Sequence, residues 1–124
     1  MPHLLIVDDD VAVAGTLTRM LELRGYQVES AQSAESGLEI AARDRPDAIL
    51  VDMRMPSMSG IEFLRHLRRD PRLQETPVAI ITGDYFLDQT QLSEIHTLGA
   101  TVRYKPLWLE DLAALAASLT GAKE

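Results

Sequence analysis

Two apolar runs in this chain end on aspartates. The run at 4–7 is followed by Asp8 and Asp9, and the run at 48–51 is followed by Asp52. Four apolar residues in a row are typical of a strand buried on both faces of a parallel sheet. The carboxyl ends of such strands form the edge at which open α/β folds bind ligands. A single aspartate there can be a helix cap or a turn residue, but two strands that end this way indicate a site.

Three carboxylates at one edge of a sheet would repel one another. Two unit charges about 4 Å apart cost about 4 kcal/mol at an effective dielectric constant of about 20, and this raises the pKa of one member of such a cluster. A hard divalent cation removes the repulsion. Mg²⁺ prefers oxygen ligands and keeps water and phosphate oxygens in its shell, so the expected chemistry is that of a Mg²⁺ site, which Mn²⁺ could also occupy.

Short apolar runs alternate with amphipathic stretches along the whole chain. Strands are expected at 3–7, 26–31, 48–52, 77–82 and 100–104, and helices at 11–24, 34–43, 61–69, 88–98 and 109–119. Strict alternation implies an α/β fold with a doubly wound parallel sheet, right-handed crossovers and helices on both faces. Asp10 is expected to cap the first helix, so it is left out of the metal shell. Residues 121–124 are expected to form a loose tail.

Length, composition and charge exclude several classes of protein. The 124 residues predict one domain, 1–124. No apolar run approaches the roughly 20 residues of a membrane helix, and no signal peptide is apparent. The chain has no cysteine, which fits a cytoplasmic location. A net charge of −7 argues against nucleic acid as the partner of this domain.

The sequence resembles a receiver domain of the bacterial response-regulator family of two-component signalling. The likeness covers essentially the whole chain and depends on residues at the ends of four predicted strands. These are Asp8 and Asp9, Asp52, Thr82, and Lys105-Pro106, together with the loop 52–60, which has Met-Pro and Gly at the family's offsets. The resemblance implies a flavodoxin-like (βα)5 sheet of strand order 2-1-3-4-5, which would place Asp52 beside the first strand.

The resemblance also implies roles for these residues. Asp52 would accept a phosphoryl group from a sensor histidine kinase or a phosphotransfer protein. Asp9 and Asp52 would bind Mg²⁺ directly, with Asp8 assisting partly through water and the main-chain carbonyl of Arg54 as a further ligand. The chain would thus be a signalling module that acts only on its own aspartate.

Two further residues, Thr82 and Lys105, would complete the catalytic set with Asp52. Lys105 would neutralise charge on the phosphoryl group. The Thr82 hydroxyl would bind a phosphoryl oxygen, draw the following loop inward and shift the helix behind it, and Gly83 would leave space for this movement. The ordinary alternatives are a solvated lysine and a β-branched strand residue.

The sequence departs from the family near its fifth strand. Val102 takes the place of an aromatic residue whose ring usually turns inward with the threonine, and Leu107 replaces the aromatic residue after Lys-Pro. Tyr104 should point to the same side as Val102. Tyr85 and Trp108 are the candidates to substitute for the missing aromatic residue.

Arg54 and Asp84 stand two residues after Asp52 and Thr82, respectively. We expect them to form an ion pair across the mouth of the site that hinders the hydrolytic water. The alternative is an exposed pair worth less than about 1 kcal/mol, without kinetic effect.

Three other functions are alternatives to a phosphorylated receiver. A phosphatase of the haloacid-dehalogenase type needs a second Asp where this chain has Arg54. A degenerate receiver that only binds a partner would not need intact Asp52, Thr82 and Lys105. Flavin binding disagrees with an acidic first loop. The possible partners include an output domain or a downstream protein. A homodimer through the last two helices is also possible.

Overall fold

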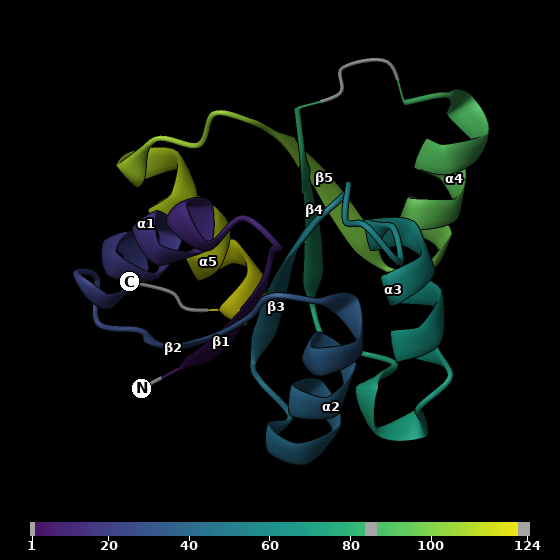
Figure 1. Ribbon diagram of the computed structural model, residues 1–124, viewed down its shortest axis with the longest axis horizontal. Coiled ribbons are helices and arrows are strands. Elements are labelled where there is room, and N and C mark those ends of the chain that lie inside the picture. The colour runs from purple at the N-terminus through teal and green to yellow at the C-terminus, as the bar shows by residue number, and fades with distance from the viewer. Residues whose placement is uncertain (1, 84–86, 122–124) are drawn as a thin grey trace.

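The computed structural model describes residues 2–83 and 87–121, which form five strands, five α-helices and one 3₁₀ turn (Figure 1). The strands are β1 (His3–Val7), β2 (Gln27–Ala31), β3 (Ala48–Asp52), β4 (Val78–Thr82) and β5 (Ala100–Tyr104). The helices are α1 (Val11–Glu22), α2 (Ala34–Asp44), α3 (Gly60–Arg68), α4 (Gln89–Thr97) and α5 (Leu109–Thr120), and η1 (Pro71–Leu73) is the 3₁₀ turn.

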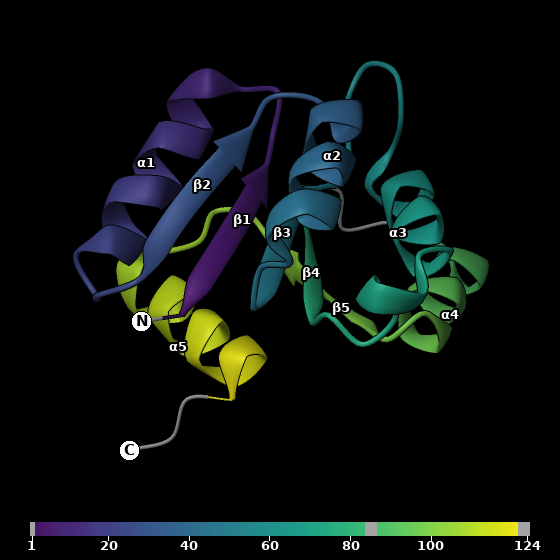
Figure 2. The same ribbon diagram turned by 90° about the horizontal axis from the view of Figure 1, so that it is seen from below.

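All strand pairs are parallel, and the strand order is β2-β1-β3-β4-β5 (Figure 2). The predicted fold and strand order are therefore confirmed. β3 and β4 are buried along their whole length, as their continuous apolar runs predict. The edge strands β2 and β5 have exposed and partly exposed positions instead, which agrees with the more polar sequence of β2.

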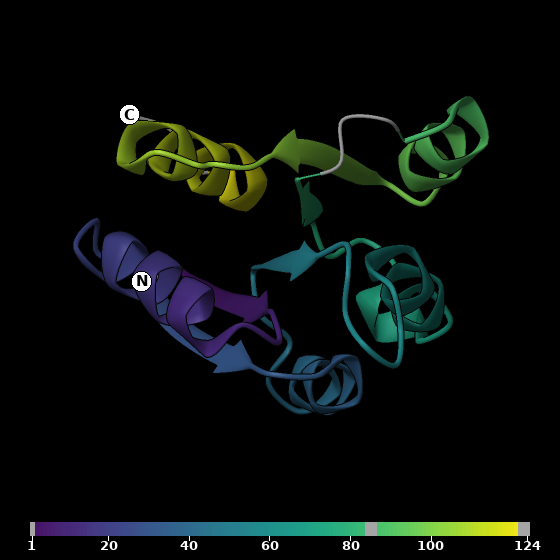
Figure 3. The same cartoon turned by 45° about the horizontal axis from the view of Figure 1, so that its top comes forward.

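The helices cover both faces of the sheet. α1 and α5 lie on one face, and α2, α3 and α4 lie along the other (Figures 1 and 3). Because side chains alternate along a strand, each strand serves both layers. In β1, Leu4 and Ile6 pack with the α1–α5 layer, while Leu5 and Val7 pack with the opposite layer.

Most element boundaries lie within two residues of their predicted positions. Asp10 caps α1 as expected, since its carboxylate accepts hydrogen bonds from the N–H groups of Ala12 and Val13. α3 begins one residue earlier than predicted because Ser59 and Glu62 form a capping box. The turn η1 was not predicted. Within the described residues, no helix combines the length and apolar character needed to cross a membrane.

Candidate functional site

The three predicted carboxylates meet at the carboxyl edge of the sheet. Asp8, Asp9 and Asp52 each offer an oxygen, and these oxygens lie within 4.8 Å of one another. β1 and β3 are neighbours, with Val7 opposite Val51, so the residues that follow them must emerge side by side. Asp8 and Asp52 are buried, at 3% and 8% exposure, and Asp9 is exposed.

Backbone N–H groups donate hydrogen bonds to the two buried carboxylates. Asp8 accepts a bond of 2.9 Å from the N–H of Asp10, and its own N–H donates to the carbonyl of Ala31. Asp52 Oδ2 accepts a bond of 3.1 Å from the N–H of Arg54. Both carboxylates are therefore fixed by the chain immediately after their strands.

Lys105 brings a positive charge into the cluster. Its Nζ lies 2.6 Å from Asp52 Oδ1, so the two oxygens of Asp52 have different partners. This contact joins the ends of β3 and β5, although the residues are 53 positions apart. The predicted convergence of Lys105 on the aspartates is thus present. The Lys105–Pro106 peptide bond is cis.

Burial and charge act against each other in this cluster. Burial raises the pKa of Asp8 above its ordinary value; the Asp10 N–H and Lys105 oppose this rise, and the charges of Asp52 and Asp9 add to it. For Lys105, burial alone would lower the pKa, but the hydrogen bond and charge of Asp52, with Asp8 and Asp10, outweigh it and raise the pKa. The raised pKa of Lys105 therefore favours its charged form, whereas the raised pKa of Asp8 means that its environment disfavours the charged carboxylate.

Thr82 ends β4 at the same edge and is 1% exposed. Its carbonyl accepts a bond of 2.8 Å from the N–H of Lys105, and Met53 donates to Ile81 at 2.9 Å. These bonds join the ends of β3, β4 and β5. A Cβ added to Gly83 would meet no atom of the described residues within 4 Å.

The loop after Asp52 closes directly onto that residue. Gly60 donates a bond of 2.8 Å to the carbonyl of Met53. A Cβ added to Gly60 would lie 2.9 Å from the main-chain oxygen of Asp52 and 3.0 Å from Met53 Cα. Because these are backbone atoms, they cannot move aside without displacing Asp52. The sequence offered only the family pattern for this glycine, and the structure supplies its steric reason.

We therefore expect Gly60→Ala to destabilise the protein by about 1–3 kcal/mol, the usual effect of adding atoms to a packed site. Gly15→Ala is the matched control, because among the described residues a Cβ there meets no atom within 4 Å beyond the adjacent backbone of α1, and α1 should gain up to about 1 kcal/mol of helix propensity. Urea unfolding of both variants measures the difference. Equal stability of Gly60→Ala and wild type would contradict the steric argument.

The remaining predicted residues differ in what the structure describes of them. The side chain of Arg54 is exposed, and Asp84 and Tyr85 lie outside the described residues, so the Arg54–Asp84 pair stays a prediction. Val102 is partly buried against the core. Trp108 is 68% exposed.

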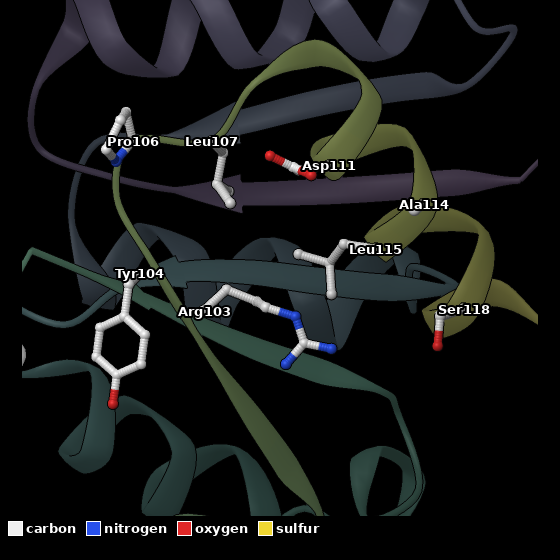
Figure 4. Close-up of a pocket in the computed structure, with 8 residues that line it drawn as sticks. All are labelled: Arg103, Tyr104, Pro106, Leu107, Asp111, Ala114, Leu115 and Ser118. Atoms are coloured by element: carbon white, nitrogen blue, oxygen red, sulfur yellow. The ribbon is translucent and has the colours of Figure 1, made fainter.

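Two grooves flank β5 and the loop after it. One, of about 450 Å³, reaches Lys105 and is lined mainly by apolar residues of α1 and the 105–108 loop, among them Val13, Leu17, Met20, Leu107 and Trp108. The other, of about 370 Å³, lies between β5 and α5 and includes Arg103, Tyr104 and Asp111 (Figure 4). Arg103 and Tyr104 leave β5 on different sides (Figure 4). No pattern in the sequence indicates either groove.

Comparison with known proteins agrees with this geometry. The sequence profile described as "Response regulator receiver domain" matches residues 4–114. Response regulator MprA of Mycolicibacterium vanbaalenii is 41% identical over 81 residues, which are 65% of this chain and 34% of that protein. The DNA-binding dual master transcriptional regulator RpaA of Synechocystis is 37% identical over 83 residues, 67% of this chain and 34% of that protein. The matched region thus spans about a third of the length of these curated relatives.

Solved structures show the same relationship. The chemotaxis protein CheY4 of Vibrio cholerae superposes with a TM-score of 0.88 at 28% identity, covering 96% of this chain and 98% of that one. A CheY-like receiver domain protein of Methanospirillum hungatei gives a TM-score of 0.87 at 27% identity, covering 98% and 94%. With the matched profile, these likenesses identify the family: the chain belongs to the response regulator receiver domains of two-component systems.

Proposed function

We propose that Asp52 accepts a phosphoryl group from a histidine kinase or phosphotransfer protein in a magnesium-dependent reaction. The main support is the meeting of Asp8, Asp9 and Asp52 with Lys105, whose Nζ is 2.6 Å from Asp52 Oδ1. The three carboxylates can hold a divalent cation, and that cation together with Lys105 would compensate the negative charge of an arriving phosphoryl group. Phosphoryl transfer asks the protein mainly for such positioning and charge compensation.

The donor set of this cluster fits Mg²⁺, which takes hard oxygen ligands and few of them from the protein. Asp9 and Asp52 would bind the ion directly, Asp8 would act partly through water, and the carbonyl of Arg54 would be a further ligand. When bound, the ion supplies charge neutralisation to the transferred group. Mn²⁺ would fit the same oxygens.

The chain's own residues divide the remaining work. A carboxylate oxygen of Asp52 attacks phosphorus, a P–O bond forms, and the P–N bond to the donor's histidine breaks, with its electron pair returning to the imidazole nitrogen. Lys105 compensates charge on the phosphoryl oxygens. Thr82 donates its hydroxyl hydrogen to one of them. The chain transfers the group only to itself, so this is a signalling module.

Phosphorylation would be transmitted through Thr82 to the helix that follows. Thr82 ends β4, and α4 is the next element along the chain. No described atom lies within 4 Å of a Cβ built at Gly83, which supports a movement of this position toward a phosphoryl group. α4 would therefore shift when Thr82 binds it, and an output domain or downstream protein would respond to the new surface.

The test of this function is incubation with acetyl phosphate and Mg²⁺, followed by intact mass. We expect a gain of one phosphate that requires Mg²⁺. No gain would instead favour a receiver that binds a partner constitutively. Sustained turnover of a phosphate ester would revive the phosphatase alternative, against which the position of Arg54 argues.

The expected pair of Arg54 and Asp84 belongs to this proposal as a modulating element. If the pair shields the phosphoryl group, Arg54→Ala and Asp84→Ala should each accelerate dephosphorylation, because the hydrolytic water enters more easily. The rate is measured as loss of the phosphate mass after the donor is removed. An unchanged rate in both variants would contradict the idea.

The partners of the whole protein are also proposals. The apolar groove beside Lys105 offers a phosphodonor a surface next to Asp52. The relative RpaA is named as DNA-binding, but the matched region spans only 34% of it, so a DNA-binding output would lie beyond the region compared. A homodimer through α4, β5 and α5 is the remaining candidate assembly.

A further inference from the structure

α4 has the weakest apolar attachment of the helices on its face of the sheet. Ile95 is its one buried residue, whereas α3 buries five residues and α2 buries four. Leu98, the residue directly after α4, is partly buried and packs against the same core cluster. A helix with few buried contacts opens or shifts at low free-energy cost. Polar contacts must therefore contribute much of what holds α4 in place.

Two arginines of α3 supply such contacts. Arg65 forms a two-bond pair with Glu94, through Nε to Oε2 and through Nη2 to Oε1 at 2.8 Å. Arg68 donates from Nε to the carbonyl of Leu98 at 2.7 Å and from Nη1 to the carbonyl of Leu73 at 2.6 Å. The contacts lie one turn apart on both helices, which are neighbours in Figure 1.

The two contacts differ in how easily they can break. The Arg68 guanidinium is partly buried and binds main-chain carbonyls, one of them at the end of α4, where a cation is favoured by the helix dipole. The Arg65–Glu94 pair is more exposed, with side-chain exposures of 48% and 32%. Exposed pairs contribute little and are readily exchanged for water. The Arg68 contact is therefore the fixed point and the Arg65 contact the releasable one.

We propose that Arg65 and Glu94 form a clasp that holds α4 in its position for unphosphorylated Asp52, and that α4 releases this clasp by pivoting about Arg68. This inference rests on the proposed function, because it assigns a regulatory element to the same switch. In this structure Asp52 is a carboxylate with Lys105 Nζ 2.6 Å from its Oδ1, and the Arg65–Glu94 pair is formed. A clasp formed in this arrangement opposes phosphorylation by its own free energy.

Beryllofluoride with Mg²⁺, a mimic of the aspartyl phosphate, provides the probe. Arg65→Ala and Glu94→Gln should each bind it about two- to fivefold more tightly than wild type, the range for removing one exposed ion pair. The exchange Arg65→Glu with Glu94→Arg should restore wild-type affinity. Arg72→Ala is the matched control, since Arg72 pairs with Asp70 at 2.9 Å with a similar exposure of 51% but lies in η1.

Titration calorimetry measures these affinities, and urea unfolding shows that each variant is folded. Mg²⁺ affinity without beryllofluoride should be the same in Arg65→Ala and Arg72→Ala, because both lose one positive charge. If wild type binds the mimic and Arg65→Ala binds it equally or more weakly, the clasp is wrong and the proposed function stands. If wild type does not bind the mimic, the proposed function fails and the clasp fails with it.

Discussion

Asp52→Asn should abolish phosphate uptake from acetyl phosphate, with a loss of at least about a thousandfold in rate. An amide lacks the anionic oxygen that attacks phosphorus, and removal of a nucleophile is among the most severe changes an active site can undergo. The substitution changes almost no volume, and the amide oxygen can still accept the bond of 3.1 Å from the Arg54 N–H. The effect would therefore be chemical, and intact mass after incubation with Mg²⁺ measures it.

Asp47→Asn is the matched control for Asp52→Asn. Asp47 immediately precedes β3, so the same change is made at the other end of the same strand, at an exposed position. Its carboxylate accepts a bond of 2.7 Å from the N–H of His3, which an asparagine oxygen can also accept. Uptake by Asp47→Asn should equal that of wild type. Phosphate on Asp52→Asn at the wild-type rate would show that another residue is the acceptor.

The carboxyl ends of β1 and β3 were predictable, because a continuous apolar run indicates a buried strand and the first charged residue after it indicates where that strand ends. The runs before Asp8 and Asp52 predicted two strands ending on acid, and β1 and β3 are indeed neighbours. Sequence periodicity alone did not give their order; the order came from the family resemblance. Once the strands are adjacent and parallel, the meeting of their carboxylates follows from register.

Contacts between distant side chains were not predictable in the same way. The pair Arg65–Glu94 joins residues 29 positions apart, and nothing in the helical pattern of either segment selects the partner. The same holds for Arg68, whose position in α3 indicates neither the carbonyl of Leu98 nor that of Leu73. Such contacts depend on how two helices cross, which is set by the packing of the whole layer.

Val102 stands where the family usually has an aromatic residue, and the sequence did not show how Tyr104, two residues later, lies relative to Thr82. Alternation predicted that Val102 and Tyr104 share one side of β5, and Val102 does pack against the core cluster of α2, α3 and α4. Tyr104 leaves the strand on a different side from Arg103 (Figure 4). A tyrosine two residues beyond the usual aromatic position is thus directed toward the same layer as α4. Tyr104 lies opposite Thr82 in the register of β4 and β5, whereas position 102, where the family usually has its aromatic residue, lies opposite Ile80. Tyr104 is therefore nearer to Thr82 along the sheet than the usual aromatic residue would be.

Asp8→Asn should weaken Mg²⁺ binding about 10- to 100-fold, the usual effect of losing a supporting ligand, and should stabilise the metal-free protein. Burial raises the pKa of Asp8, and the charges of Asp52 and Asp9 add to this. A raised pKa in the folded state means that protonation of Asp8 favours folding. This stability is present below the unfolded-state pKa and is lost as the pH rises through the folded-state pKa. At neutral pH the charged Asp8 therefore destabilises the metal-free fold, and asparagine removes that effect.

Urea unfolding in the presence of a chelator measures this difference. At neutral pH, Asp8→Asn should exceed wild type by an amount on the order of 1 kcal/mol, since Lys105 offsets part of the repulsion. The difference should shrink as the pH falls and wild-type Asp8 takes up its proton. Asp9→Asn makes the same charge change at an exposed position, so it should weaken Mg²⁺ binding with a smaller gain in stability. If both variants gained the same free energy of unfolding, the net charge of the cluster, and not the burial of Asp8, would be what destabilises the metal-free protein.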